Sequence, residues 1–169
     1  VTEIVGAGGE AFGLAGDVCD EAYAKALVNA AIGEYGGLDV GFNNAGRLGT
    51  LGSLDDITVD DWDKTLRANL TSAMFGAKYQ LPEIAKRGGG SVIFTSTFVG
   101  HTIGMPGMTA YAASKMGLLG MAQCLAVEAL PVIRKLVRWL RSSMLWAVLR
   151  IHPRLPRQPC FWHRMLQAL

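Results

Sequence analysis

The sequence predicts an α/β fold in which a parallel sheet is flanked by helices. Two short apolar runs, residues 38–42 and 91–96, have the length and composition of buried strands. Longer segments with apolar residues at helical spacing are found near residues 20–35, 59–79 and 111–129. Because strands and helices alternate along the chain, we expect neighbouring strands to pair in parallel.

The first residues contain a glycine pattern that needs its context to be interpreted. Residues 6–11, Gly-Ala-Gly-Gly-Glu-Ala, fit the letters of the dinucleotide fingerprint G-x-G-x-x-G/A, which must follow a strand and open a helix. The following residues, 11–16, are short, interrupted by glycine and followed by a turn, so they predict a strand at 11–15. We therefore interpret the glycines as a helix end leading into that strand.

The first long helix, near residues 20–35, is amphipathic. Its predicted buried face consists of Tyr23, Ala26, Leu27, Ala30 and Ala31.

The helix at 59–79 follows a capping-type sequence at residues 58–61. Its apolar stripe consists of Trp62, Leu66, Leu70, Ala73 and Ala77. Asn69 falls on this stripe, and a carboxamide in such a place requires hydrogen-bond partners.

The last strand and helix carry the most informative side chains. Ser96 and Thr97 follow the strand at its carboxyl end, where α/β sheets place their ligands. Tyr111 and Lys115 are four residues apart and share one helix face. A nearby cation favours a phenolate, which suits a tyrosine to general acid/base chemistry. This pair alone also fits a tyrosine packed on the core beside a solvated lysine.

Four features occur in a characteristic order: an Asn-Asn-Ala-Gly turn at 43–46, Asn69, the hydroxyls at 96–97 and Tyr111 with Lys115. Together they resemble the short-chain dehydrogenase/reductase family. The resemblance runs from residue 1 to about 128 and includes Gly-Asp-Val at 16–18, which is similar to the family's turn beside the adenine ring.

The resemblance implies an oxidoreductase that transfers hydride between NAD or NADP and a carbonyl compound or secondary alcohol. Tyr111 would exchange the proton with the substrate oxygen, and Lys115 would favour its phenolate and hold the nicotinamide ribose. Asn69 would hold a water of the proton relay. Either Ser96 or Thr97 would polarise the substrate oxygen, because counting back from Gly100 reaches Thr97, whereas the family usually has serine there.

The same resemblance places Tyr111 as well as Lys115 among the cofactor-binding residues. It also implies contacts to adenine and ribose from five further residues, Asp17, Val18, Asn44, Ala45 and Gly46. Alternatives without a ligand remain for several of these positions. Asp17, Asn44 and Gly46 are also ordinary turn residues, and Asn69 also fits a helix amide that satisfies itself. The preference between NAD and NADP is not readable.

The family begins with a strand, a glycine-rich turn and a helix, which we do not find before residue 1. We therefore expect residues 1–129 to be an incomplete Rossmann-like, doubly wound parallel sheet that lacks the first β-α-β unit and the pyrophosphate site. In the strand order 3-2-1-4-5-6, the strand at 11–15 would be the third, and those at 38–42 and 91–96 the fourth and fifth.

The composition changes near residue 130. Residues 1–130 hold 8 Lys and Arg against 14 Asp and Glu, net −6, whereas residues 131–169 hold 8 and none, net +8. We interpret residues 130–169 as a basic tail that does not resemble the family. We hypothesise that it comes from a shifted reading frame. The hypothesis is refuted if the neighbouring frames of the coding DNA contain no family-like continuation. Residues 132–141 predict an amphipathic basic helix suited to anionic lipid or nucleic acid.

The alternative function is accordingly an inactive, truncated fragment whose tail binds polyanions or membrane surfaces without selectivity. We expect no specific nucleic-acid partner. A homo-oligomer is implied by the resemblance alone.

The whole chain has 169 residues, of which 50% are hydrophobic, enough to form a core. We find no apolar stretch of transmembrane length and no signal segment, so the expected compartment is the cytoplasm. Three scattered cysteines argue against a disulfide framework, and we predict no metal site.

Overall fold

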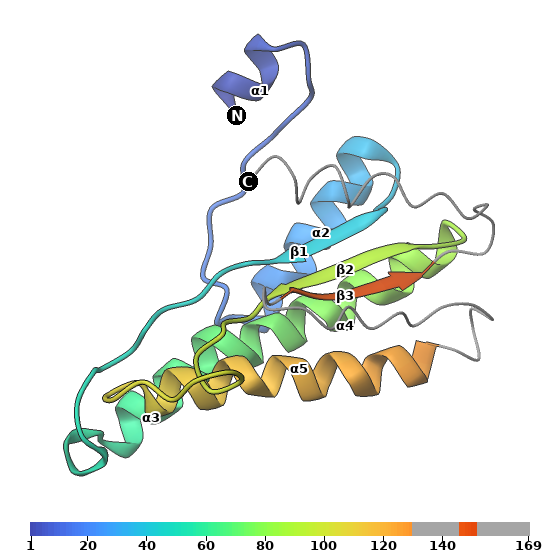
Figure 1. The fold of residues 1–169 in the computed structure, drawn as a ribbon. Coiled ribbons are helices and arrows are strands. Elements are labelled where there is room, and N and C mark those ends of the chain that lie inside the picture. Colours follow the sequence, from blue (N-terminus) through green and yellow to red (C-terminus); the bar gives the residue numbers. More distant parts are fainter. Residues whose placement is uncertain (130–145, 152–169) are drawn as a thin grey trace.

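The computed structural model describes residues 1–129 and 146–151 (Figure 1). The helices and strands in chain order are α1 (Thr2–Gly6), α2 (Glu21–Tyr35), β1 (Val40–Asn43), a 3₁₀ turn (Leu54–Asp56), α3 (Val59–Leu66), the π-helical segment η2 (Arg67–Thr71), α4 (Ser72–Lys86), β2 (Gly90–Thr95), α5 (Thr109–Ala129) and β3 (Trp146–Ile151).

The sheet of the described residues has the order β1-β2-β3. β1 and β2 are parallel, with Val40 opposite Ser91 and Asn43 opposite Phe94, which confirms the predicted pairing. β3 runs antiparallel to β2, with Trp146 opposite Thr95. This strand was not predicted, so the predicted parallel pairing describes β1 and β2, and the antiparallel edge is an addition to it.

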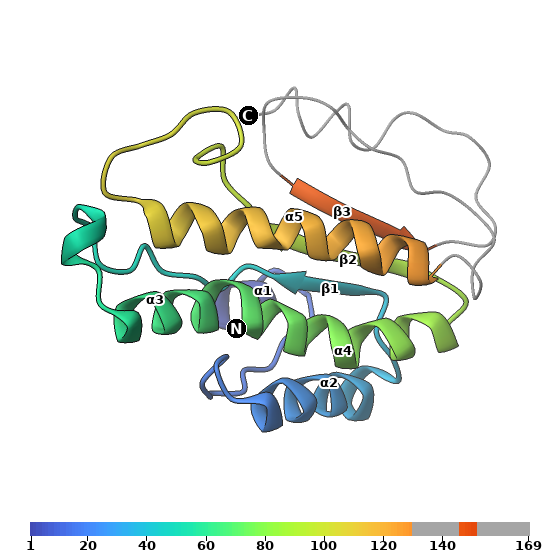
Figure 2. The same cartoon turned by 90° about the horizontal axis from the view of Figure 1, so that it is seen from below.

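Helices α4 and α5 lie side by side against the sheet, and α2 packs against α4 (Figure 2). The core fills the space between β2 and these two helices. Burial alternates along β2, as expected for a strand that turns one face to the core. The core consists of Ala73, Ala77, Ile84, Val92, Phe94, Leu118, Ala122 and Ala126.

The predicted strand at 11–15 is wrong. Within the described residues this segment forms no ladder, and Phe12 and Leu14 are exposed. A strand requires a neighbour for its backbone hydrogen bonds, and this segment pairs with none of the strands of the described sheet. The glycines before it do form a helix end, as predicted: α1 stops at Gly6, and Gly8 has a φ of 82°.

Helix α2 is rotated relative to the prediction. Ala24 and Val28 are its buried residues, whereas Ala26 and Leu27 are exposed. The prediction required α2 to be covered along a broad apolar stripe. Among the described elements α2 packs chiefly on α4, so only a narrow stripe of its surface is buried.

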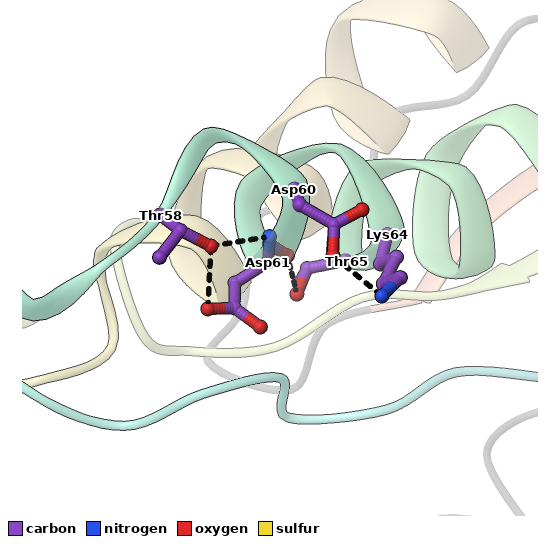
Figure 3. Close-up of polar contacts among 5 residues, drawn as sticks. All are labelled: Thr58, Asp60, Asp61, Lys64 and Thr65. Atoms are coloured by element: carbon purple, nitrogen blue, oxygen red, sulfur yellow. Dashed lines mark hydrogen bonds and ion pairs between the residues drawn. The ribbon is translucent and has the colours of Figure 1, made fainter.

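The predicted helix at 59–79 forms but is longer, because α3, η2 and α4 continue without a break to Lys86. Pro82 lies inside α4, and the helix continues beyond it to Lys86. Ile84, in this last turn, is fully buried in the core. At the other end, the Thr58 hydroxyl accepts from the N–H of Asp61 at 3.1 Å, which confirms the predicted cap (Figure 3).

None of the helices in the described part of the chain is long and apolar enough to cross a membrane. The basic helix predicted at 132–141 lies outside the described residues.

A reciprocal pair of amide hydrogen bonds joins β1 to α4. Asn43 Nδ2 donates to Gln80 Oε1 at 2.8 Å, and Gln80 Nε2 donates to Asn43 Oδ1 at 3.2 Å. A Cβ on Gly76 would overlap with Asn43 Oδ1, and one on Gly41 would overlap with Gln80 Oε1. Both glycines are therefore explained by close approach of the strand and the helix.

We predict that Gly76→Ala lowers the free energy of unfolding by about 1–3 kcal/mol, because the added methyl group displaces the Asn43 carboxamide. The matched control is Gly33→Ala in α2, where nothing lies within 4 Å of an added Cβ. There the better helix propensity of alanine should stabilise by about 0.5–1 kcal/mol. Urea unfolding of both variants tests this, and equal effects would contradict the packing argument.

Candidate active site

Lys115 is a buried lysine at the centre of the predicted site. Its side chain extends from α5, is 4% exposed and donates from Nζ to the carbonyl oxygen of Thr95 at 2.7 Å. Burial lowers the pKa of the Lys115 ammonium from its ordinary value of 10.5. The alternative of a solvated lysine beside a core tyrosine is therefore wrong for Lys115.

Asn69 connects three parts of the chain through one side chain. Its Oδ1 accepts from the N–H of Arg47 at 2.7 Å, and its Nδ2 donates to the Arg47 carbonyl at 2.8 Å and to Ser114 Oγ at 2.9 Å. These partners lie on other segments, so the self-satisfied helix amide is also wrong. Because both N–H groups are engaged, the side chain acts as a brace between the loop after β1 and α5.

The brace continues to Tyr111 through Ser114. Ser114 Oγ donates to the Tyr111 carbonyl at 2.7 Å, so Asn69, Ser114 and Tyr111 form a hydrogen-bonded chain. Asn69 itself lies in η2, the wider π-helical turn between α3 and α4. Such turns inside α-helices often occur at functional sites.

Gly46 lies against both polar groups. A Cβ on Gly46 would be 3.1 Å from Asn69 Oδ1 and 3.1 Å from Lys115 Nζ. Gly46 is not among the residues with positive φ, so close approach explains this glycine better than turn chemistry does. The backbone of the Asn-Asn-Ala-Gly loop thus reaches the side chains of η2 and α5.

Asn44 and Ala45 of that loop are exposed. Asn44 Oδ1 accepts from Thr95 Oγ1 at 2.8 Å, which attaches the loop to the end of β2. Ala45 is exposed next to it.

The two candidate hydroxyls have different neighbours. Ser96 Oγ donates to the Lys115 carbonyl at 3.1 Å, whereas Thr97 Oγ1 accepts from the N–H of Val99 at 3.3 Å. In the described part of the chain neither is hydrogen-bonded to Tyr111, which is half-buried one helical turn before Lys115. The choice between Ser96 and Thr97 therefore stays open.

Asp17 and Val18 lie in a turn outside this cluster. The Asp17 carboxylate is exposed and accepts from the N–H of Cys19 at 2.8 Å, an ordinary turn contact. The turn is joined to η2 by Arg67, whose Nε and Nη2 donate to the Cys19 carbonyl at 3.0 and 2.7 Å. The sequence analysis missed Arg67, because no pattern links residues so far apart in the chain.

Arg47, Thr95 and Ser114 were also missed as members of the site. Arg47 contributes backbone atoms, and Thr95 binds Lys115 through its carbonyl; such backbone roles do not depend on the side-chain type and leave no signal in a sequence. Thr95 also contributes its hydroxyl, which donates to Asn44. Ser114 could have been found, since it is a polar residue between Tyr111 and Lys115 on a helix that is otherwise largely apolar.

The family model described as short chain dehydrogenase matches residues 1–135. The chain belongs to the short-chain dehydrogenase family. The match extends past residue 129, where we placed the domain boundary.

Two curated relatives illustrate the similarity. The chain is 32% identical to cyclohexanol dehydrogenase from Acinetobacter sp. over 128 residues, covering 76% of this chain and 51% of the relative. It is 35% identical to dehydrogenase/reductase SDR family member 4 from Homo sapiens, covering 82% of this chain and 53% of the relative. The chain thus spans about half the length of the curated relatives it matches.

Solved structures confirm the predicted Rossmann-like fold class. A 3-ketoacyl-ACP reductase from Sinorhizobium meliloti superposes with a TM-score of 0.73 at 36% identity, covering 77% of this chain and 51% of that one. A short-chain dehydrogenase from Burkholderia cenocepacia, solved in complex with NADP, gives 0.71 at 32% identity, with 78% and 52% covered.

The buried lysine predicts a pH dependence of stability. The folded state releases the Lys115 proton at a lower pH than the unfolded state, so the unfolded state binds more protons between the two pKa values. The free energy of unfolding of the wild type, relative to Lys115→Met, should therefore rise as the pH increases toward 10.5. Urea unfolding of both proteins across pH 7–10.5 measures the difference; a constant difference would contradict burial of the ammonium.

Proposed function

We propose that this protein is an NAD- or NADP-dependent oxidoreductase that interconverts a carbonyl compound and a secondary alcohol. The proposal rests on the close contact of Gly46 with Asn69 and Lys115. It places the buried Lys115 ammonium beside the backbone of Gly46, which has no side chain to block a ligand. Family membership supports the same activity.

The residues around Lys115 fit the nicotinamide side of such a cofactor. An ammonium has three N–H donors, and the described contacts of Lys115 use one, to the Thr95 carbonyl. The others suit ribose hydroxyls. Any Cβ at Gly46 would narrow the space beside Nζ, which favours a ligand that lies flat on the loop. We assign ribose contacts to Asn44, Ala45 and Gly46.

The adenine side of the cofactor would lie at Asp17 and Val18. The exposed Asp17 carboxylate is an acceptor that suits an exocyclic amine. When bound, the nicotinamide ring would supply or accept the hydride. The protein would supply the proton and hold the substrate and the cofactor in place.

Tyr111 would move the proton. In the direction of reduction, its phenol donates a proton to the substrate oxygen as negative charge develops there, and in the direction of oxidation the phenolate takes the proton back. Lys115 lies one helical turn further along α5. Ser96 or Thr97 would donate a hydrogen bond to the same oxygen, and Asn69 would keep α5 in place through Ser114.

For cofactor binding, we predict saturable binding of NADH or NADPH by the full chain, followed by energy transfer from protein fluorescence to the nicotinamide. Lys115→Met should raise the Kd at least about tenfold, because it removes the charged donor for the ribose hydroxyls. No binding up to millimolar cofactor, or binding that Lys115→Met leaves unchanged, would contradict the proposal.

For catalysis, Tyr111→Phe should lower kcat for carbonyl reduction by about 10²–10⁴-fold while cofactor binding is retained, because the substitution removes the proton donor and keeps the aromatic ring. Tyr35→Phe on α2 is the matched control, since Tyr35 is an exposed tyrosine on another helix. It should keep wild-type kcat. Steady-state rates with a panel of ketones test this, and a Tyr111→Phe enzyme with wild-type kcat would exclude the assigned role.

A further inference from the structure

Arg67 is a surface arginine with an unusually well-defined position. Its Nε and Nη2 both donate to one acceptor, the Cys19 carbonyl, at 3.0 and 2.7 Å. The guanidinium also lies over the ring of Phe75, with 5.1 Å from Cζ to the ring centroid. Hydrogen bonds in the guanidinium plane and stacking on its face together fix its orientation.

Cys19 is held from both sides of its backbone. Its carbonyl accepts from Arg67, and its N–H donates to the Asp17 carboxylate at 2.8 Å. The orientation of that carboxylate therefore depends on where the Cys19 backbone is held, and Arg67 holds it.

The other end of this connection is the proposed catalytic site. Arg67 is the first residue of η2, and Asn69 lies two residues further along the same segment. The Arg67 side chain thus connects two parts of the proposed site. One is the turn that contains Asp17 and Val18, and the other is η2, whose Asn69 holds the loop at Gly46.

We propose that Arg67 is a positioning residue that sets the adenine-side turn relative to the nicotinamide-side site. The inference rests on the proposed function, because it concerns how the two halves of one dinucleotide site are held in register. Arg67 acts through Cys19 and Asp17 and has no assigned contact with the cofactor.

Separate contacts hold the neighbouring helix, so the role of Arg67 can be tested in a folded protein. Lys78 Nζ and the Tyr79 hydroxyl donate to Glu21 at 2.6 and 2.9 Å, and thereby attach the start of α2 to α4. Loss of the Arg67 contacts should accordingly loosen the turn and leave α2 in place.

The test compares Arg67→Met and Arg67→Lys with a control of equal charge change, Lys64→Met. Lys64 is an exposed residue of α3 whose ion pair with Asp60 stays within that helix (Figure 3). The probes are NADH, measured by titration, and ADP, which lacks the nicotinamide ring together with its ribose and is measured by calorimetry.

Arg67→Met should raise the Kd of NADH and of ADP by a similar factor, about tenfold, because the adenine side is misplaced for both. Arg67→Lys should recover part of the loss, and Lys64→Met should match the wild type. Lys115→Met should by contrast weaken NADH more than ADP, because ADP lacks the ribose that Lys115 is proposed to hold.

Unchanged affinities in Arg67→Met, or a loss for NADH that spares ADP, would overturn the inference while leaving the proposed function intact. A wild-type chain that binds neither NADH nor NADPH would overturn both, so the two failures are distinguishable.

Discussion

The arrangement of the site depends on the carboxamide of Asn69. It is 1% exposed, and its three hydrogen bonds join the loop after β1, the π-helical segment and α5. Without this side chain, the Arg47 N–H and carbonyl and the Ser114 hydroxyl would each lose a partner. For Ser114, which is fully buried, the lost partner costs about 1–3 kcal/mol. The geometry at Gly46 and Lys115 therefore follows from the position of one amide.

Whereas the hydrogen bonds of Asn69 stabilise the fold, burial of the Lys115 ammonium destabilises it. Burying an ammonium is unfavourable, and the described partner is one backbone carbonyl, with no carboxylate among its hydrogen bonds in the described part. A purely structural position would be filled more favourably by an apolar side chain. An incompletely compensated charge beside an open backbone surface at Gly46 is consistent with selection for binding a polar ligand.

Much of this could be predicted from the sequence because the signals were local. The β2 strand, the capping of α3 by Thr58 and the inward position of Asn69 follow from period and spacing within single elements. The failures involve partners distant in the chain. The segment at 11–15 was predicted as a strand, but it pairs with no strand of the described sheet. Strand β3 pairs with β2, from which it is separated by about fifty residues of sequence. The contact of Arg67 with Cys19 joins two residues whose types do not reveal the pairing.

Hydrogen exchange at the backbone N–H of Arg47 tests the central claim most directly, because this group donates to Asn69 Oδ1. We predict slow exchange in the wild type, slower exchange after addition of NADH, and rapid exchange in Asn69→Leu. Exchange in the wild type at the rate of an exposed peptide, unaffected by NADH, would contradict the account that Asn69 assembles a dinucleotide site in this chain.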